Sequence, residues 1–133
     1  MSTLIPQPLP ITNLEHDERP WGEYTVYLKN LKGPLTVKLI KVKPGQRNSL
    51  QYHNLRAETW FVVSGKMLAS IDGLDTEYSA GEAVAVPCGA HHRFTGLDEE
   101  CLLIEIATGR FEEHTDNYRI EDDYGREHEY DKK

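Results

Sequence analysis

The chain has 133 residues, 28% of them charged, with a formal net charge of -7 and an isoelectric point of about 5.3. This acidic balance argues against nucleic acid as a partner, because a phosphate backbone is bound by clustered basic residues. The sequence contains no apolar run of the ~18 residues that a membrane helix needs, so we expect no membrane partner. One globular domain is predicted, in which local arginines rather than the overall field hold any anionic ligand.

The compartment is predicted from the cysteines and from the start of the chain. Two cysteines, Cys88 and Cys101, do not make a disulfide framework. The first residues lack the basic start and the long apolar stretch of a secretory signal. We therefore expect a cytoplasmic protein.

The pattern of prolines, glycines and β-branched residues predicts an all-β chain. Three prolines at positions 6, 8 and 10 predict an extended N-terminal arm over residues 1–18. Residues 19–126 are expected to form the domain and 127–133 an acidic, polar tail, with one helical turn at 111–119. Short apolar segments separated by Gly, Pro and Asp turns are typical of a sandwich or barrel. The expected strands are Leu35–Val42, Ser49–His53, Thr59–Ser64, Lys66–Ile71, Thr76–Ser79, Ala83–Val86, Arg93–Thr95 and Cys101–Ala107.

Two of these segments are predicted to supply the core. One is the apolar run at residues 60–63. In the other, Leu102, Ile104 and Ile106 alternate and so share one face of a strand. Glu105 lies on the opposite face, and we expect it to point outward, with a supporting contact to a metal site as the alternative.

Two segments carry residues that are typical metal ligands. Gln51 and His53 are two residues apart, so on a strand both side chains point to one face, and Glu58 follows five residues later. A second predicted strand ends in a Pro-Cys-Gly turn at 87–89 and leads to two adjacent histidines, His91 and His92. Two imidazoles, a carboxylate and an amide oxygen would form a mixed site for a divalent metal. The alternative is that His53 is a core histidine and Glu58 a surface charge.

The spacing of these residues resembles the two motifs of the cupin family. The first motif is Gly, five residues, His-x-His, three or four residues, Glu, six residues, Gly, and the second is Gly, five residues, Pro-x-Gly, two residues, His. The resemblance implies an all-β cupin double-stranded β-helix, or jelly-roll barrel, here with an extended N-terminal arm. Gln51 replaces the first histidine, and Gly96 stands where asparagine is usual. The matching positions are Gly45, Gln51, His53, Glu58 and Gly65, then Gly81, Pro87, Gly89 and His92.

A narrower resemblance is carried by the element Ser-Leu-Gln-x-His-x-x-Arg-x-Glu-x-Trp at residues 49–60. Together with Arg-Pro-Trp-Gly at 19–22 and Asp-x-Tyr-Gly-Arg at 122–126, it resembles the cupin domain of type II phosphomannose isomerases. In that family this domain usually follows a mannose-1-phosphate guanylyltransferase domain, for which this sequence has no room. The resemblance implies one divalent ion, zinc or a similar metal, on Gln51, His53, Glu58 and His92. This sequence departs from the family at Ala107, where glutamine is usual, and at His114 and Thr115, where acidic residues are usual.

The chemistry implied by the resemblance is the interconversion of mannose 6-phosphate and fructose 6-phosphate, which moves a proton between C1 and C2. Lys38 is the predicted proton carrier and Arg56 its electrostatic partner. The alternatives are a surface lysine and an arginine in a salt bridge. Three further arginines are predicted to hold the phosphate, although each alone also fits a surface charge. They are Arg19, Arg119 and Arg126.

Three functions remain open on the sequence. The first is the isomerase, and the second is a cupin that binds a sugar or sugar nucleotide without turnover in polysaccharide synthesis. The third is an iron-dependent oxygenase, against which the amide ligand Gln51 counts. We expect a small-molecule sugar phosphate as ligand and a homodimer in which residues 3–14 add to a partner's sheet edge.

Overall fold

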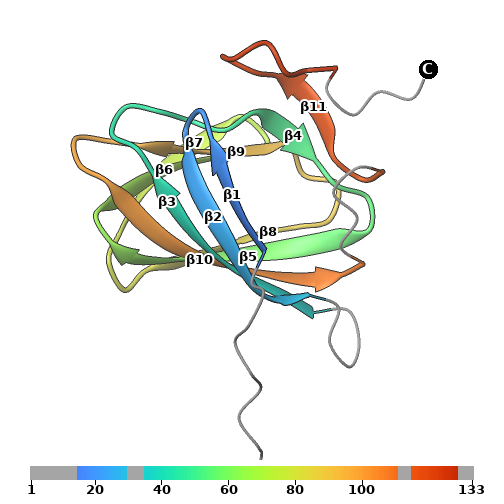
Figure 1. Cartoon of the computed structure of the whole chain (residues 1–133), viewed down its shortest axis with the longest axis horizontal. Helices are drawn as coiled ribbons and strands as arrows, with labels where there is room; N and C mark the ends of the chain where they lie inside the picture. Colours follow the sequence, from blue (N-terminus) through green and yellow to red (C-terminus); the bar gives the residue numbers. More distant parts are fainter. Residues whose placement is uncertain (1–14, 30–34, 111–114, 129–133) are drawn as a thin grey trace, which may run out of the picture.

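The computed structural model describes residues 15–29, 35–110 and 115–128. These residues form eleven strands and no helix (Figure 1), and so include no helix that is long and apolar enough to cross a membrane. The strands are β1 (Glu15–Arg19), β2 (Gly22–Lys29), β3 (Leu35–Val42), β4 (Leu50–Tyr52), β5 (Arg56–Ser64), β6 (Lys66–Ile71), β7 (Leu74–Ser79), β8 (Ala83–Val86), β9 (His92–Gly96), β10 (Cys101–Gly109) and β11 (Tyr118–Glu121).

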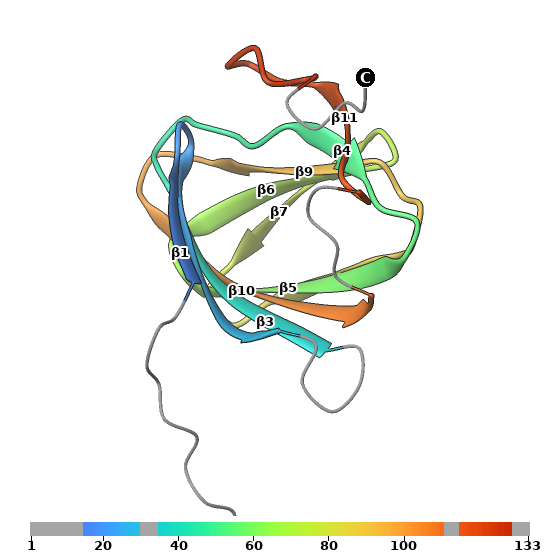
Figure 2. The same cartoon turned by 45° about the vertical axis from the view of Figure 1, so that its right-hand side comes forward.

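The strands form two antiparallel sheets that face each other as the walls of a flattened barrel (Figure 2). The first sheet has six strands in the order β1-β2-β3-β10-β5-β8, and the second has five in the order β11-β4-β9-β6-β7. The short strand β11 pairs with β4 and lies at the C-terminal end of the described chain, above the barrel in Figure 1. This is the jelly-roll architecture that the cupin resemblance implies, so the predicted fold class is confirmed.

The core lies between the sheets because alternate residues of each strand point inward. Trp60 of β5, Leu103 of β10 and Met67 of β6 are all fully buried. The Trp60 ring packs edge-on against Phe94 of β9, with 5.4 Å between ring centroids. Burial of each such side chain stabilises the fold by about 1.5–3 kcal/mol. The interior also contains polar and titratable side chains, and six of them gather at the candidate site: Lys38, His53, Arg56, Glu58, His92 and Glu105.

Each of the eight predicted strands is present, and three have the predicted bounds, namely β3, β6 and β8. Strands β1, β2 and β11 were not predicted. In β2, buried residues such as Tyr24 and Val26 alternate with more exposed ones. The sequence therefore contained the period-two pattern that predicts this strand. β1 and β11 are short and polar, and pairing with a neighbouring strand defines them more than composition does.

Two predictions for the ends of the chain are only partly covered by the described residues. The arm was expected over residues 1–18, but β1 begins at Glu15, inside that range, and residues 1–14 lie outside the described part. The helical turn was expected at 111–119. Residues 115–117 instead form a turn that leads into β11, and 111–114 are outside the described part.

The predicted orientation of β10 was wrong. Its buried residues are those of the odd positions, such as Leu103 and Glu105, whereas Ile104 is partly exposed and Ile106 is 38% exposed. The strand is apolar on both faces, so hydrophobicity alone could not choose between them. The strand register determines which face of β10 is buried. Glu105 pairs with Lys38 on one side and with Trp60 on the other, and both of these residues point inward.

The structure explains why a glycine occupies position 96, where the cupin motif usually has asparagine. It ends β9, where its carbonyl accepts a hydrogen bond from the Gly45 amide (3.0 Å) and its amide donates to Gln46 (2.8 Å). A Cβ on Gly96 would lie 2.4 Å from the carbonyl oxygen of Lys43, so a side chain would require the backbone to move. The close approach of this loop fixes the segment that leads into β4.

Candidate metal centre

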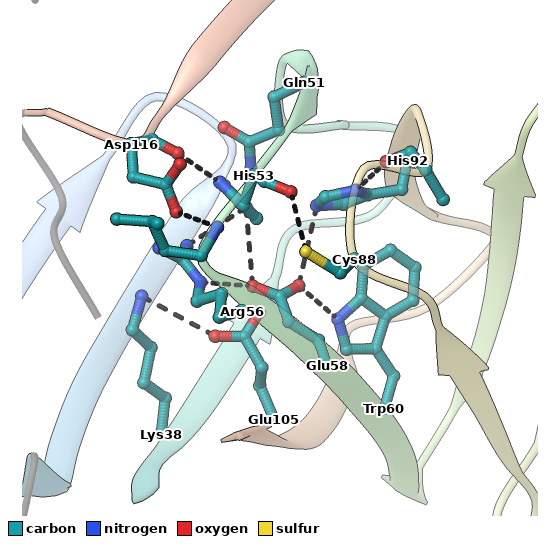
Figure 3. A network of polar contacts seen from close by, with 12 residues as sticks. Lys38, Gln51, His53, Arg56, Glu58, Trp60, Cys88, His92, Glu105 and Asp116 are labelled. Atoms are coloured by element: carbon teal, nitrogen blue, oxygen red, sulfur yellow. Dashed lines mark hydrogen bonds and ion pairs between the residues drawn. The ribbon is translucent and has the colours of Figure 1, made fainter. Parts of the chain in front are cut away.

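The predicted metal ligands come from opposite walls of the barrel. Glu58 lies on the inner face of β5 in the six-stranded sheet. Gln51 of β4 and His92 of β9 are paired neighbours in the five-stranded sheet, and His53 follows β4 directly. Because the two sheets face each other, the side chains of His53, Glu58 and His92 point toward one another across the interior (Figure 3).

The spacing of three ligand atoms fits a single metal ion. Nε2 of His53 lies 3.4 Å from Oε2 of Glu58, and Nε2 of His92 lies 3.5 Å from Oε1 of Glu58. The ligand atoms of these three buried residues all lie within 4.8 Å of one another. Ligand atoms that share a tetrahedral ion at about 2.1 Å are about 3.4 Å apart. The three residues are therefore spaced as ligands of one metal ion would be.

A hydrogen bond at Nδ1 holds each of the two imidazoles in the tautomer whose Nε2 can bind a metal. Nδ1 of His53 contacts the carbonyl oxygen of Asp116 at 2.8 Å, and Nδ1 of His92 contacts that of Ala90 at 2.8 Å. A carbonyl only accepts, so each Nδ1 carries the proton and each Nε2 presents a lone pair. Among the described residues, nothing donates a hydrogen bond to Nε2 of His92, which is buried. Burial, with Arg56 and His92 nearby, lowers the pKa of His53 to about 4, so it is neutral at pH 7.

Glu58 is the anionic centre of this network. Its Oε2 accepts from Nε of Arg56 at 3.0 Å, and its Oε1 accepts from the indole Nε1 of Trp60 at 3.2 Å. Burial alone would raise the pKa of Glu58, but its electrostatic interactions with His92, His53 and Arg56 bring it well below its ordinary value. The carboxylate is therefore ionised and oriented before any ligand arrives.

Two other residues of the motif segments, Gln51 and His91, make contacts that differ from those of the three clustered residues. Gln51 borders the adjacent pocket, and its Oε1 accepts a hydrogen bond from the Ser49 hydroxyl at 3.2 Å. Its role as a fourth ligand stays a prediction. His91 is exposed and stacks on Tyr52 outside the site, with 5.1 Å between ring centroids. Its position agrees with the motif register, which selects His92.

A pocket beside the metal ligands is lined by five basic side chains and one acid. The acid is Glu105, and Gln51 with Ser49 adds neutral polar groups. All the residues that were predicted to act on a sugar phosphate therefore border one cavity, although the sequence separates the first and last by more than 100 positions. The basic residues are Arg19, Lys38, Arg56, Arg119 and Arg126.

Lys38 and Glu105 form a buried ion pair on adjacent strands, with 3.6 Å between Nζ and Oε2. The ammonium also lies 4.6 Å from the ring centroid of Tyr24. Burial and the charge of Glu58 raise the pKa of Glu105 to about 7, although Lys38 and Arg56 act in the opposite direction. The prediction that Glu105 points outward was wrong, and its alternative, a contact next to the metal site, describes its position.

The three other arginines line the pocket while bonding to their neighbours. Nη2 of Arg19 lies 2.8 Å from Oδ2 of Asp17, and Arg126 donates two hydrogen bonds of 2.9 Å to the carboxylate of Asp122. Nη1 of Arg119 donates to the carbonyl oxygen of Arg126 at 3.3 Å. Each is therefore oriented by a local contact as well as facing the cavity.

Asp116 is a site residue that the sequence analysis missed. Its carboxylate accepts from the amides of Asn54 (2.8 Å) and Leu55 (3.0 Å), while its carbonyl orients His53. These bonds tie the segment that leads into β11 to the loop after β4 (Figure 3). A lone aspartate in an acidic stretch gave no signal for this role, because the contact spans more than 60 residues.

A protein-family model described as "Mannose-6-phosphate isomerase C-terminal" matches residues 11–122. The chain belongs to this family. Among curated relatives, the alginate biosynthesis protein AlgA of Pseudomonas aeruginosa is 38% identical over 109 residues, which cover 81% of this chain and 22% of that protein. Xanthan biosynthesis protein XanB of Xanthomonas campestris is 37% identical over 109 residues, covering 81% of this chain and 23% of that protein. The chain thus spans about a fifth of the length of these family members.

Solved structures of cupins are similar to this chain. Capsular polysaccharide assembling protein CapF of Staphylococcus aureus matches with a TM-score of 0.68 and 25% identity, over 81% of this chain and 32% of that one. Oxalate decarboxylase OxdC of Bacillus subtilis matches with a TM-score of 0.73 and 15% identity, over 83% of this chain and 31% of that one. The second likeness shows the fold alone.

Proposed function

We propose that this protein binds a sugar phosphate beside a divalent metal ion and interconverts mannose 6-phosphate and fructose 6-phosphate, in the cytoplasm, for polysaccharide precursor synthesis. One observation carries the proposal. Three convergent ligand atoms, on His53, Glu58 and His92, adjoin a pocket lined by five basic side chains. The names of the relatives, which concern alginate and xanthan biosynthesis, support the setting.

The donor set fits zinc, because two imidazole nitrogens and a carboxylate are its usual ligands, and the Gln51 amide oxygen is offered as the fourth. When bound, such an ion supplies a Lewis acid that polarises a carbonyl and stabilises enediolate charge. The protein's part is to keep both Nε2 atoms unprotonated and Glu58 ionised, which the contacts to Asp116, Ala90 and Trp60 support.

Lys38 is our candidate for the group that moves the proton between C1 and C2. It lines the pocket, is 6% exposed and pairs with Glu105, a carboxyl group that can share its proton near neutral pH. Glu58 is an unsuitable base when its carboxylate holds the metal. The guanidinium groups of Arg19, Arg119 and Arg126 present N–H donors suited to a phosphate.

The test is an isomerase assay on zinc-loaded protein, with mannose 6-phosphate as substrate and fructose 6-phosphate as the detected product. Lys38→Met is expected to abolish turnover and leave the zinc content unchanged, whereas His53→Ala loses both. Full activity in Lys38→Met would show that its assigned role is wrong.

A second candidate is a cupin that binds a sugar or sugar nucleotide without turnover. Ala107 favours it, because this residue stands on the inner face of β10, paired with Glu58, where the type II isomerases usually have glutamine. Zinc-loaded protein that binds mannose 6-phosphate by calorimetry, yet yields no fructose 6-phosphate, would support this candidate over the isomerase.

A further inference from the structure

Residues 116–126 contact two parts of the candidate site, and we call them the β11 segment. At its start, the buried carboxylate of Asp116 accepts hydrogen bonds from the amides of Asn54 (2.8 Å) and Leu55 (3.0 Å). The carbonyl oxygen of the same residue contacts Nδ1 of His53. The segment also supplies three residues to the wall of the pocket, namely Asn117, Arg119 and Arg126. One short piece of chain thus contacts both a candidate metal ligand and the basic pocket.

The contacts of Asp116 position this residue and the loop after β4 together. A carboxylate that is removed from water is stable only when hydrogen-bond donors surround it. Two backbone amides supply these donors, and they belong to the residues that directly follow His53. The imidazole of His53 is oriented by the carbonyl of the same aspartate. A shift of the β11 segment at Asp116 therefore changes the direction of Nε2, the atom that would bind the metal.

Several contacts that attach the β11 segment to the barrel are exposed. Within the described chain, β11 is an edge strand paired with β4, and its register shifts between Arg119 and Glu121. On the surface, Arg47 donates two hydrogen bonds, of 2.7 and 2.9 Å, to Asp123. Nη1 of Arg93 lies 3.4 Å from the exposed carboxylate of Glu121. Because exposed ion pairs contribute little to stability, we expect this segment to open more readily than the core strands.

An anion in the pocket would join the β11 segment to the barrel wall. Arg119 and Arg126 lie on the segment, whereas the other basic side chains of the pocket belong to β1, β3 and β5. Like charges around one cavity repel each other, and a phosphate between them replaces this repulsion by charge-assisted hydrogen bonds. Bound phosphate therefore holds the segment, and Asp116 with it, against the barrel.

We propose that Asp116 is a positioning residue that couples the pocket to the metal centre, so that phosphate bound beside the β11 segment raises the affinity of His53, Glu58 and His92 for a metal ion. The inference rests on the metal site and the phosphate pocket of the proposed function, but it does not depend on isomerase turnover. Coupling between two sites is reciprocal, so the metal raises the affinity for phosphate by the same factor. The protein thereby binds its metal most tightly when a sugar phosphate is present.

Zinc affinity with and without saturating inorganic phosphate tests the coupling, measured on the full chain by competition with a fluorescent chelator. We expect phosphate to lower the zinc dissociation constant about fivefold or more, and zinc to lower the phosphate dissociation constant equally in calorimetry. Asp116→Ala is expected to weaken zinc binding about tenfold without phosphate and to abolish the effect of phosphate. Asp123→Ala is the matched control, because this carboxylate of the same segment also accepts two hydrogen bonds, but from exposed Arg47. Its zinc dissociation constants are expected to match those of the unmodified protein.

Hydrogen exchange in the metal-free, unmodified protein tests the same contact without zinc. Phosphate is expected to slow the exchange of the Asn54 and Leu55 amides, since both bond to Asp116. The His91 amide provides an internal control, because it bonds in the same way to the carboxylate of Asp72 (2.8 Å), which lies outside the segment. Its exchange rate is expected to stay unchanged. This measurement needs no variant, so misfolding of Asp116→Ala does not affect it.

The outcomes separate this coupling from other routes. A phosphate effect that persists in Asp116→Ala would overturn the proposal, because it would arise from direct contact of phosphate with zinc or from Arg56. Equal losses in Asp123→Ala would also overturn it, since they would assign the effect to general loosening of the segment. Zinc and phosphate that bind independently would contradict the coupling and leave the proposed function standing, whereas a protein that binds neither would contradict both.

Unchanged exchange of the Asn54 and Leu55 amides in the presence of bound phosphate would likewise contradict the role of Asp116.

Discussion

Nη2 of Arg56 lies 3.0 Å from Nε2 of His53, so the guanidinium uses the lone pair that a metal would need. The same arginine donates from Nε to Glu58, and it also lines the pocket. Arg56 therefore stands between the pocket and the ligand atoms. A guanidinium and a metal ion cannot share one lone pair, so metal binding requires Arg56 to release His53.

Replacing Arg56 by glutamine should separate the stability of the metal-free protein from its metal affinity. The variant leaves the buried carboxylate of Glu58 without its cation, and breaking a buried pair costs about 3–5 kcal/mol. We expect the free energy of unfolding of metal-free protein to fall by about that amount in urea titrations. Zinc affinity should rise tenfold or more by calorimetry, because a competing cation is gone. Weaker zinc binding in the variant would show that Arg56 helps to hold the metal.

Adjacent histidines provide a matched test of the metal centre. His92→Ala removes a buried imidazole whose Nε2 faces Glu58, whereas His91→Ala removes an exposed ring stacked on Tyr52. We expect bound zinc, measured by atomic emission after dialysis, to fall from about one per chain to a trace in His92→Ala. His91→Ala should retain the unmodified content. Equal losses in both variants would contradict the assignment.

Acid should destabilise the metal-free protein through His53. The pKa of this residue falls from its ordinary 6.5 in the unfolded chain to about 4 in the folded one. Below pH 6.5 the unfolded state takes up a proton that the folded state does not, so stability is lost as the pH falls toward 4. The full difference is about 3 kcal/mol. Urea titrations at pH 7, 6 and 5 measure it, and a His53→Gln variant should show a flatter dependence. An identical slope in that variant would assign the effect to other groups.

The two thiols should react differently. Cys101 is fully buried, and burial raises the pKa of its thiol to about 11, whereas Cys88 is exposed. Because the thiolate is the reactive form, we expect one thiol per chain to react with Ellman's reagent at pH 8 and two after denaturation. A Cys88→Ser variant should show none in the native state. Rapid reaction of both native thiols would contradict the packing of β10 against the core.

The clustering of the candidate metal ligands could be predicted in large part because the motifs are local. Gln51, His53 and Glu58 lie within eight positions, and strand geometry relates their directions without knowledge of the rest of the fold. His92 needed the cupin resemblance, since only the facing of the two sheets brings it to Glu58.

Residues whose roles depend on distant partners were predicted less well. Glu105 was assigned outward because its neighbours Ile104 and Ile106 resemble a core face, and only the register with Lys38 reverses that assignment. The apolar character of a strand on both sides does not indicate which side faces the core of its own chain.

The bonds of Asp116 have a consequence for the order of synthesis. His53 and the loop after it are fixed by a residue that leaves the ribosome more than 60 positions later. The pairing of β10 with both β3 and β5 also awaits the second half of the chain. A nascent chain that stops before residue 101 therefore lacks the strand between β3 and β5 and the clamp on His53. We therefore expect metal binding at this candidate site only after residues 101–116 have been synthesised.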